Sequence, residues 1–282
     1  MAFTNTNTLA YGNESVDTRF SALVEPNLYA AEIFQPNISY TDKYQVDQAG
    51  QIFVRKLGKA SVDTDGGLSF THNQTADSLI PIVMDQDYKL SEAIYEEVET
   101  ARVSGTGVQK FETVMETVKE KWQTDALTTL VAGATAASGT DATAAADAKT
   151  AIIDVRKELK DNSAKPNVLI ASTKFFAAIL GFSGKEYQPN TNDEILRTGV
   201  VGTFLGIKVY ESELLSDDGA DGATEFVMYD HDAFSILSKL IAARIIDAGK
   251  DWVGSAAQVH IKSAFTVTNA DRVYKKTVVV TG

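Results

Sequence analysis

The chain has 282 residues, of which 44% are hydrophobic and 23% are charged, which is typical of folded proteins, and its length suffices for one large domain or two ordinary ones. The 38 Asp and Glu residues outnumber the 26 Lys and Arg residues, and the formal net charge of −12 argues against nucleic-acid binding over a broad surface, although it leaves room for a local basic patch. Cysteine is absent, so disulfides, thiolate nucleophiles and Cys-ligated zinc or iron–sulfur sites are excluded.

The first 45 residues are mixed in composition and weakly periodic, with Asn and Pro scattered among short apolar pieces. We expect an extended arm over residues 1–45 with at most one short helix. The chain starts without a basic or apolar segment, and no window approaches the ~18 apolar residues of a membrane span. We therefore expect the protein to be made and folded in a cytoplasm.

A hairpin is predicted next. The runs Gln51–Leu57 and Leu68–Thr71 have the composition of strands, and the Asp- and Gly-rich segment 62–67 between them suits a turn that needs positive φ. The tip and the distal strand, including residues 72–75, are polar on both faces. An isolated two-stranded ribbon is only marginally stable in water. The hairpin therefore needs a partner surface.

The strongest periodic signal predicts a long helix from Thr106 to Ala132, with Gly133 as a suitable stop. About 25 residues at ~1.5 Å each give roughly 38 Å, which few single domains need. Apolar residues recur there at alternating steps of three and four, as on one face of a helix. They are Val108, Phe111, Met115, Val118, Trp122 and Ala126.

An α/β unit follows a linker at 134–146. A second helix, which ends by Lys165-Pro166, carries an apolar face of Ala148, Ile152, Val155 and Leu159. A buried strand at 167–171, a helix at 175–180 and a loop at 181–192 come next. Beyond Gly199 the pattern is mainly that of strands, at 206–210, 224–229, 235–246, 259–268 and 272–280.

Candidates for catalysis are few. Asp230 and Asp232 flank His231, but adjacent side chains are not expected to aim at one another, so a Ser-His-Asp site is not predicted. The run 217–222 imitates the start of a calcium loop but lacks the closing Glu at position twelve. We predict no catalytic residue, no cofactor and no metal. The histidines are His72, His231 and His260.

Two clusters of charge are best explained by a protein partner. A dense acidic run repels itself unless a basic surface covers it, and the basic set in the predicted hairpin is too small for a nucleic-acid footprint. The alternative is an acidic hydrolase that uses a pair of these glutamates in the manner of a glycosidase. The acidic residues are Glu92, Glu96, Glu97 and Glu99, and the basic residues are Arg55, Lys56 and Lys59.

Two segments in the second half carry recognisable patterns. Residues 202–210 (GTFLGIKVY) form a glycine-bounded strand, and residues 226–234 (FVMYDHDAF) end in a DxxAF pattern. They resemble the "LG(I/V)PV" and "GDxxAF" segments of the major capsid proteins of tailed bacteriophages, whose Hong Kong 97-type fold is also found in encapsulin shells. Lys208 stands where proline is common in that family, and Tyr229 where glycine is common. The element order matches from about residue 20 to Gly282.

The resemblance implies an α+β phage major-capsid fold with an N-terminal arm, an extended hairpin loop, a peripheral domain with a long spine helix, and an axial α/β domain. In the family the hairpin lies across a neighbouring subunit, so the basic strand is expected to dock in trans on the acidic run. The implied division is an arm at 1–45, the extended loop hairpin at 46–80, the peripheral domain with its spine helix at 81–137, the axial domain at 138–240, and return strands of the peripheral domain at 241–282.

The resemblance also implies a non-enzymatic structural protein that self-assembles as hexamers and pentamers into an icosahedral shell. The shell would enclose viral double-stranded DNA without sequence-specific binding, in a virion assembled in the bacterial cytoplasm and with no membrane partner. A separate scaffolding protein is expected because no scaffolding segment is visible, together with portal and decoration proteins, and crosslinking through Lys56 or Lys59 is not expected. An encapsulin-like compartment for protein cargo is the alternative within the fold.

Overall fold

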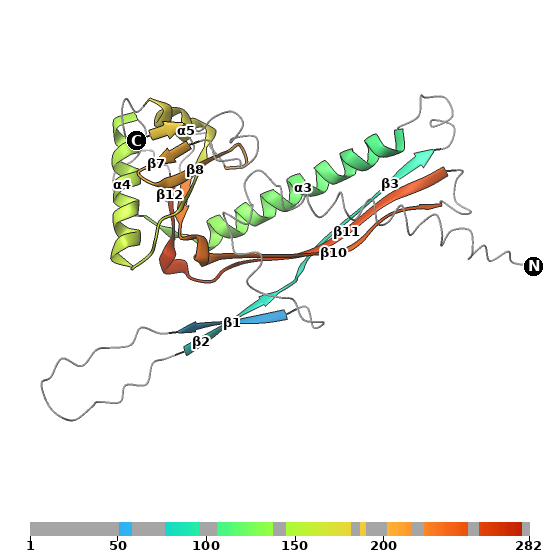
Figure 1. Ribbon diagram of the computed structural model, residues 1–282, viewed down its shortest axis with the longest axis horizontal. Helices are drawn as coiled ribbons and strands as arrows, with labels where there is room; N and C mark the ends of the chain where they lie inside the picture. Colours follow the sequence, from blue (N-terminus) through green and yellow to red (C-terminus); the bar gives the residue numbers. More distant parts are fainter. Residues whose placement is uncertain are drawn as a thin grey trace, which may run out of the picture.

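The computed structural model describes residues 51–57, 77–95, 106–137, 145–181, 187–189, 202–215, 223–247 and 254–277. Within this part the chain forms two sheets joined by a long helix, with a two-stranded ribbon projecting from one of them (Figure 1). The predicted arm (1–45), turn (62–67) and distal hairpin strand (68–71) lie outside the described residues.

Helix α3 spans Thr106–Gly133 and confirms the predicted long helix. Its 28 residues extend roughly 42 Å at ~1.5 Å each. Gly133 ends it, and a Cβ at this position would lie 2.6 Å from Val267 Cγ2, so the close approach of helix and strand requires glycine. The buried face of α3 comprises Val114, Met115, Val118, Trp122, Ala126, Leu127 and Leu130.

This face packs on a three-stranded antiparallel sheet of order β10-β11-β3 (Figure 1). Side chains alternate between the two faces of a strand, so Tyr88, Val259 and Ile261 point to α3 and their neighbours in sequence point away. The strands are β3 (Gln86–Tyr95), β10 (Phe234–Asp247) and β11 (Gly254–Val267).

Two polar contacts fasten α3 to this sheet. The buried indole of Trp122 donates from Nε1 to Ser263 Oγ at 2.8 Å, and its ring meets Phe265 edge-on with centroids 5.4 Å apart. The Tyr88 hydroxyl donates to Asp125 Oδ2 at 3.0 Å, and burial raises the pKa of Tyr88. Both contacts satisfy polar atoms that would otherwise be buried without a partner.

A seven-stranded mixed sheet lies near the C-terminal end of α3 (Figure 1). Helices α4 (Ala145–Asp161) and α5 (Thr173–Leu180) cover one face, and the other face contributes to the core beneath α3. In spatial order its strands are β4 (Thr135–Ala136), β12 (Val273–Thr277), β9 (Thr224–Tyr229), β5 (Val168–Ser172), β8 (Ile207–Ser212), β7 (Gly202–Phe204) and β6 (Tyr187–Pro189).

The central strand β5 separates two cores. Val168 and Ile170 join the core of α3, whereas Leu169 and Ala171 join the core under α4 and α5. A strand buried on both faces has a continuous apolar sequence. This explains why the sequence predicts β5 correctly.

Most predicted elements of the second half are confirmed. The strands β8, β9, β10, β11 and β12 overlap the predicted runs, and α5 matches its predicted helix. Helix α4 ends at Asp161, before the predicted stop at Lys165. The segment 241–282 divides between the sheets, because β11 pairs with β10 and β3 whereas β12 pairs with β9. The predicted apolar face of α4 is fully buried at Ala148, Ile152, Val155 and Leu159.

The projecting ribbon consists of β1 (Gln51–Leu57) and β2 (Asp77–Val83). The first strand confirms the prediction, but its described partner is β2, which the sequence analysis does not identify as a strand. Burial explains this pairing, because Ile82 is fully buried against Leu237 and Ala264 on the sheet face that points away from α3. The ribbon is thereby rooted on that face.

A two-residue turn, Leu205-Gly206, joins β7 to β8 between the paired residues Phe204 and Ile207. Both turn residues have positive φ, 49° for Leu205 and 82° for Gly206, as a type I′ hairpin turn requires. Glycine adopts this conformation without steric cost, whereas a leucine in it is strained. The LG pair of the sequence motif is therefore a turn, with Leu205 exposed at its tip.

Trp122→Ala should lower the free energy of unfolding by about 3–5 kcal/mol, because it removes a large buried side chain and leaves Ser263 without its partner. Glu120→Ala, on the exposed face of the same helix, should change it by less than about 0.5 kcal/mol. Urea unfolding followed by circular dichroism measures both values. Equal effects of the two substitutions would contradict the anchoring role of Trp122.

Leu205→Asn should raise the midpoint of thermal unfolding, because Asn-Gly is a preferred pair for this turn and Asn tolerates positive φ. Gly206→Ala should lower the free energy of unfolding by roughly 1–2 kcal/mol, since a Cβ is strained at this φ. Thermal scans of both variants beside the parent test the pair. A destabilised Leu205→Asn variant would show that contacts of the leucine outweigh its strain.

Candidate functional site

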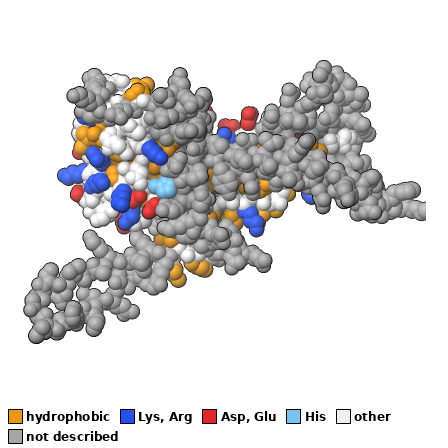
Figure 2. Space-filling model, in the orientation of Figure 1, with side chains coloured by type: hydrophobic (Ala, Val, Ile, Leu, Met, Phe, Trp, Pro, Cys, Tyr) orange, Lys and Arg blue, Asp and Glu red, His pale blue; other side chains and the backbone are white. Residues whose placement is uncertain are grey.

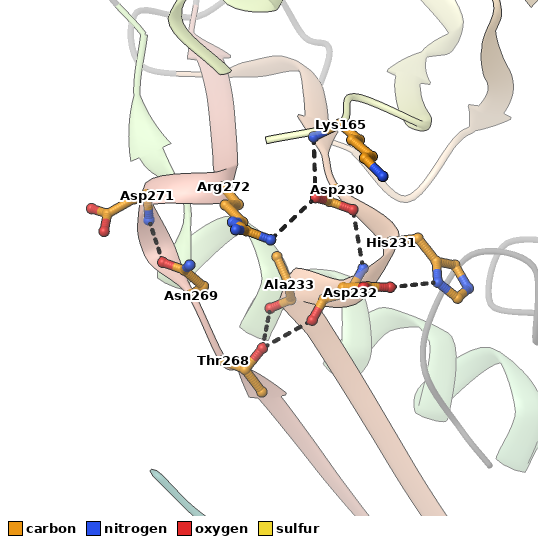
Figure 3. A network of polar contacts seen from close by, with 9 residues as sticks. All are labelled: Lys165, Asp230, His231, Asp232, Ala233, Thr268, Asn269, Asp271 and Arg272. Atoms are coloured by element: carbon orange, nitrogen blue, oxygen red, sulfur yellow. Dashed lines mark hydrogen bonds and ion pairs between the residues drawn. The ribbon is translucent and has the colours of Figure 1, made fainter. Parts of the chain in front are cut away.

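Two chain crossings connect the two sheets and lie side by side (Figure 3). One runs from β9 through the 3₁₀ turn η1 (His231–Ala233) into β10, and the other from β11 through the 3₁₀ turn η2 (Ala270–Arg272) into β12. Because both crossings link the same two sheets, the contacts between them determine how the sheets sit relative to one another.

Asp230 is the central side chain of this junction and is buried. Its carboxylate accepts from the backbone N–H groups of Lys165 at 3.1 Å and Asp232 at 3.4 Å. It also lies 3.5 Å from Arg272 Nη1, and the Asp230 backbone N–H donates to the Arg272 carbonyl at 3.1 Å. One residue thereby holds the α4–β5 connection and both crossings together (Figure 3).

Thr268 makes a second link between the crossings. Its backbone N–H donates to the Ala233 carbonyl at 2.8 Å. Its hydroxyl lies 3.1 Å from the same oxygen and 3.2 Å from the Asp232 carbonyl oxygen. The end of β11 is therefore fixed against η1 by side chain and backbone.

The DxxAF pattern of the sequence is the first of these crossings. Asp230 caps η1, Ala233 and Phe234 are buried, and Phe234 meets Tyr229 edge-on with centroids 6.4 Å apart. The sequence analysis finds the motif but not the role of Asp230. Its partners Lys165 and Arg272 are remote in the chain, and no local signal connects them.

The described histidines contact carboxylates. His231 Nδ1 lies 3.5 Å from Asp232 Oδ1, so the expectation that these adjacent side chains do not aim at one another is wrong, because the tight turn η1 brings them together. His260 Nε2 contacts Asp87 Oδ1. A hydrogen bond from Lys89 holds the pKa of Asp87 below its usual value, and the contact with His260 acts in the same direction.

Within the described ranges, no group of three His, Asp or Glu side chains could hold a metal ion. None of the helices in the described part of the chain is both long and apolar enough to cross a membrane. His72 and the run 217–222 lie outside the described residues.

The predicted intersubunit contacts fall in different parts of the structure. Arg55 and Lys56 lie in β1, paired with Leu79 and Ser78 of β2. Glu92 lies half-buried in β3 and belongs to a different sheet. Within one subunit the structure therefore does not bring these residues together. The remaining predicted contacts, Lys59, Glu96, Glu97 and Glu99, lie outside the described residues.

The ribbon has an exposed apolar face that the sequence analysis misses. Phe53, Leu79 and Val83 are 59%, 64% and 47% exposed, and Phe53 pairs with the exposed Pro81. Figure 2 shows hydrophobic side chains gathered at the base of the ribbon. The signal was present in the run 79–83, which is apolar at every position and so supplies both a buried and an exposed apolar face.

The fold is similar to that of chains in solved structures from phages and from a virus-like particle. Mycobacterium phage Che8 has a chain with a TM-score of 0.64 and 18% identity, covering 81% of this chain and 85% of its own. A chain in the asymmetric unit of the bacteriophage PhiM1 mature capsid gives a TM-score of 0.58 and 11% identity, covering 87% of this chain and 85% of that chain. A chain of a virus-like particle from Pyrococcus furiosus gives a TM-score of 0.60 and 10% identity, covering 93% of this chain and 99% of that chain.

A family model described as phage capsid protein matches residues 109–274, which is more than half of the chain. The chain therefore belongs to the phage capsid protein family. The resemblance to major capsid proteins of the Hong Kong 97 type is confirmed. No curated protein sequence matches the chain.

Asp230→Ala should lower the free energy of unfolding by about 2–4 kcal/mol, because it leaves two backbone N–H groups and the Arg272 guanidinium without their shared acceptor. Asp232→Ala is the matched control, since it removes the same charge from an exposed neighbour and should cost less than about 0.5 kcal/mol. Chemical denaturation measures both. If Asp232→Ala lowered the free energy of unfolding as much as Asp230→Ala, the loss would be due to the change in net charge and not to the contacts of the junction.

Proposed function

We propose that this protein is the major capsid protein of a tailed bacteriophage, assembling as hexamers and pentamers into an icosahedral shell around viral double-stranded DNA. Membership of the phage capsid protein family supports the proposal, as does the likeness to a mature bacteriophage capsid. The observation that carries it is the ribbon, which exposes Phe53, Leu79 and Val83.

The ribbon needs a surface to cover this face. Fully burying a side chain such as Phe, Leu or Val contributes about 1.5–3 kcal/mol, and a two-stranded ribbon alone is marginal in water. In a shell every subunit presents the same ribbon, and symmetry repeats one favourable contact throughout the particle. The occupant we propose is therefore a second copy of this chain.

Charge is proposed to orient this contact. The basic residues of the hairpin would face the acidic run of the neighbouring copy, although exposed ion pairs contribute only about 0.2–1 kcal/mol each. Asp87, close to that run, is already bonded to Lys89 and His260 within its own subunit. Apolar burial would then supply most of the affinity. The charged residues concerned are Arg55, Lys56 and Lys59 on one copy and Glu92, Glu96, Glu97 and Glu99 on the other.

The predicted domain division belongs to the same proposal. This division places α3, as the spine helix, in the peripheral domain at 81–137, α4 and α5 in the axial domain at 138–240, and β11 and β12 among the return strands of the peripheral domain at 241–282. The arm (1–45) and the extended loop (46–80) complete the subunit. A separate scaffolding protein, a portal and decoration proteins would act with it during assembly in the bacterial cytoplasm, and function would reside in these surfaces instead of a catalytic pocket.

A shell for protein cargo is the second candidate. The likeness to a virus-like particle from Pyrococcus furiosus, over 93% of this chain and 99% of that one, supports a closed shell that is not a phage head. Electron microscopy of the recombinant protein separates the two. Small closed shells formed by the protein alone would support the cargo shell, and larger heads that need an added scaffold would support the phage head.

The double substitution Phe53→Asp and Leu79→Asp should abolish closed particles, because it places charge on the face that a neighbour would bury. Both side chains are exposed in the subunit, so its unfolding free energy should change by less than about 0.5 kcal/mol each. Electron microscopy scores particles, and chemical denaturation scores the subunit. Normal particles from the double variant would contradict the proposed contact.

Two controls sharpen this test. Leu180→Asp alters an exposed leucine of α5, away from the ribbon, and should leave assembly intact. Reversal of Arg55, Lys56 and Lys59 to Glu should slow assembly at low salt without abolishing it. Its effect should fade as the Debye length shortens from ~10 Å at 0.1 M to ~3 Å at 1 M salt.

A further inference from the structure

The face of the three-stranded sheet that points away from α3 gathers basic side chains from all three strands. Lys89 lies in β3, Lys262 in β11, and Lys239 and Arg244 in β10, each next in sequence to a residue of the core beneath α3. Lys89, Lys239 and Arg244 are exposed, and Lys262 is half-buried. In Figure 2, basic side chains show beneath β10 and β11, on the side opposite α3.

Among the described residues of this face, one acid lies within the basic row, so positive charge predominates without being unopposed. Asp87 is that acid: it stands opposite Lys262 in the β3–β11 ladder, and its two oxygens contact Lys89, at 2.8 Å, and His260. Lys239 and Lys262 stand directly opposite one another in the β10–β11 ladder. Like charges in such a pair are destabilising, and neither lysine has an ion-pair partner in the described part of the chain.

Basic residues elsewhere are differently placed. On α4, Arg156, Lys157 and Lys160 are interleaved with Asp154 and Glu158, so that surface carries charges of both signs. The stripe on the sheet differs in its balance, because Lys89, Lys239, Lys262 and Arg244 face the one acid Asp87 among its described residues. The net positive charge of the stripe favours an anionic partner.

The chemistry of the face favours a phosphate backbone over another protein. The centre of a protein interface is depleted of charge and rich in apolar side chains, whereas here the charges occupy the middle and Ile241 is the large apolar side chain exposed beside them. From Lys239 to Arg244 the strand extends roughly 14 Å, the length over which one strand of DNA presents about four phosphates. Gln258 and Ser91 add hydrogen-bonding groups in the row of Arg244.

We propose that this face of the three-stranded sheet binds the phosphate backbone of double-stranded DNA without reading its sequence. Contacts to phosphate position a protein on DNA but carry no sequence information. The inference rests on the proposed function, because a shell around DNA brings the duplex against one side of every subunit. The net charge of −12 would repel DNA elsewhere and confine contact to this stripe.

Fluorescence anisotropy tests the proposal with a labelled 20-base-pair duplex of arbitrary sequence and the full-length chain as dissociated subunits. We expect binding whose affinity falls with salt between 50 and 200 mM, with a slope of log K against log salt of about −3 to −4 for up to four neutralised phosphates. Lys239→Glu with Lys262→Glu should weaken binding at least ~10-fold and reduce the slope by about 2. A second, unrelated duplex should bind equally.

Lys157→Glu with Lys160→Glu is the matched control, because it makes the same change in net charge at two exposed positions of α4, away from the proposed site. It should bind DNA within about twofold of the parent once the general change in charge is allowed for. If the Glu pair on the sheet perturbs folding, Lys239→Gln with Lys262→Gln should still reduce the salt slope by about 2.

The inference would be overturned if the parent did not bind DNA at 50 mM salt, or if both double variants lost the same amount of affinity. It would also be overturned if Lys239→Glu with Lys262→Glu left DNA binding unchanged but altered the particle size measured by light scattering. The last would show that the face binds another copy. Shell formation is scored separately by electron microscopy. If shells form but the protein does not bind DNA, this inference is wrong and the proposed function is unaffected. If the protein binds DNA but forms no shells, the proposed function is contradicted and the DNA-binding face is supported.

Discussion

Burial of one face of α3 is the contact on which the rest of the described structure depends. The apolar side chains of this helix share a single core with the three-stranded sheet and with one face of the seven-stranded sheet. A buried side chain of this size contributes about 1.5–3 kcal/mol, so the shared core outweighs any one polar contact around it. Trp122 lies within that core and adds a directional bond, which sets the position of the helix along β11.

The two crossings around Asp230 convert this shared core into a defined arrangement of sheets. Apolar packing is not directional, and two sheets on a common core could slide or rotate relative to one another. Hydrogen bonds to Asp230 and Thr268 have preferred geometry and connect both crossings. The angle between the sheets therefore depends on a few polar atoms where the chain passes between them.

The three-stranded sheet has two faces with different chemistry. The face under α3 is apolar and buried, whereas the opposite face carries the root of the ribbon at one end and a row of basic side chains beyond it. A shell protein acts through such surfaces, because each is repeated in every subunit. Stability and the proposed function are thus assigned to opposite sides of one sheet.

The sequence by itself determines the elements whose signal is local. Alternating steps of three and four between Met115, Val118 and Trp122 predict α3, and the continuous apolar run of β5 predicts a strand buried on both faces. The pairing of β1 with β2 was decided by tertiary structure, because it depends on the burial of Ile82 against a sheet formed by residues remote in the chain.

The candidate sites belong to the second class. Asp230 stands in a motif that the sequence reveals, but its partners Lys165 and Arg272 become neighbours only when three segments converge. Lys239 and Lys262 are unremarkable in the sequence and stand opposite one another because β10 and β11 pair in one register. Periodicity reports which face of an element is apolar, whereas strand order and register decide which distant side chains meet, and these depend on the free energy of the whole core.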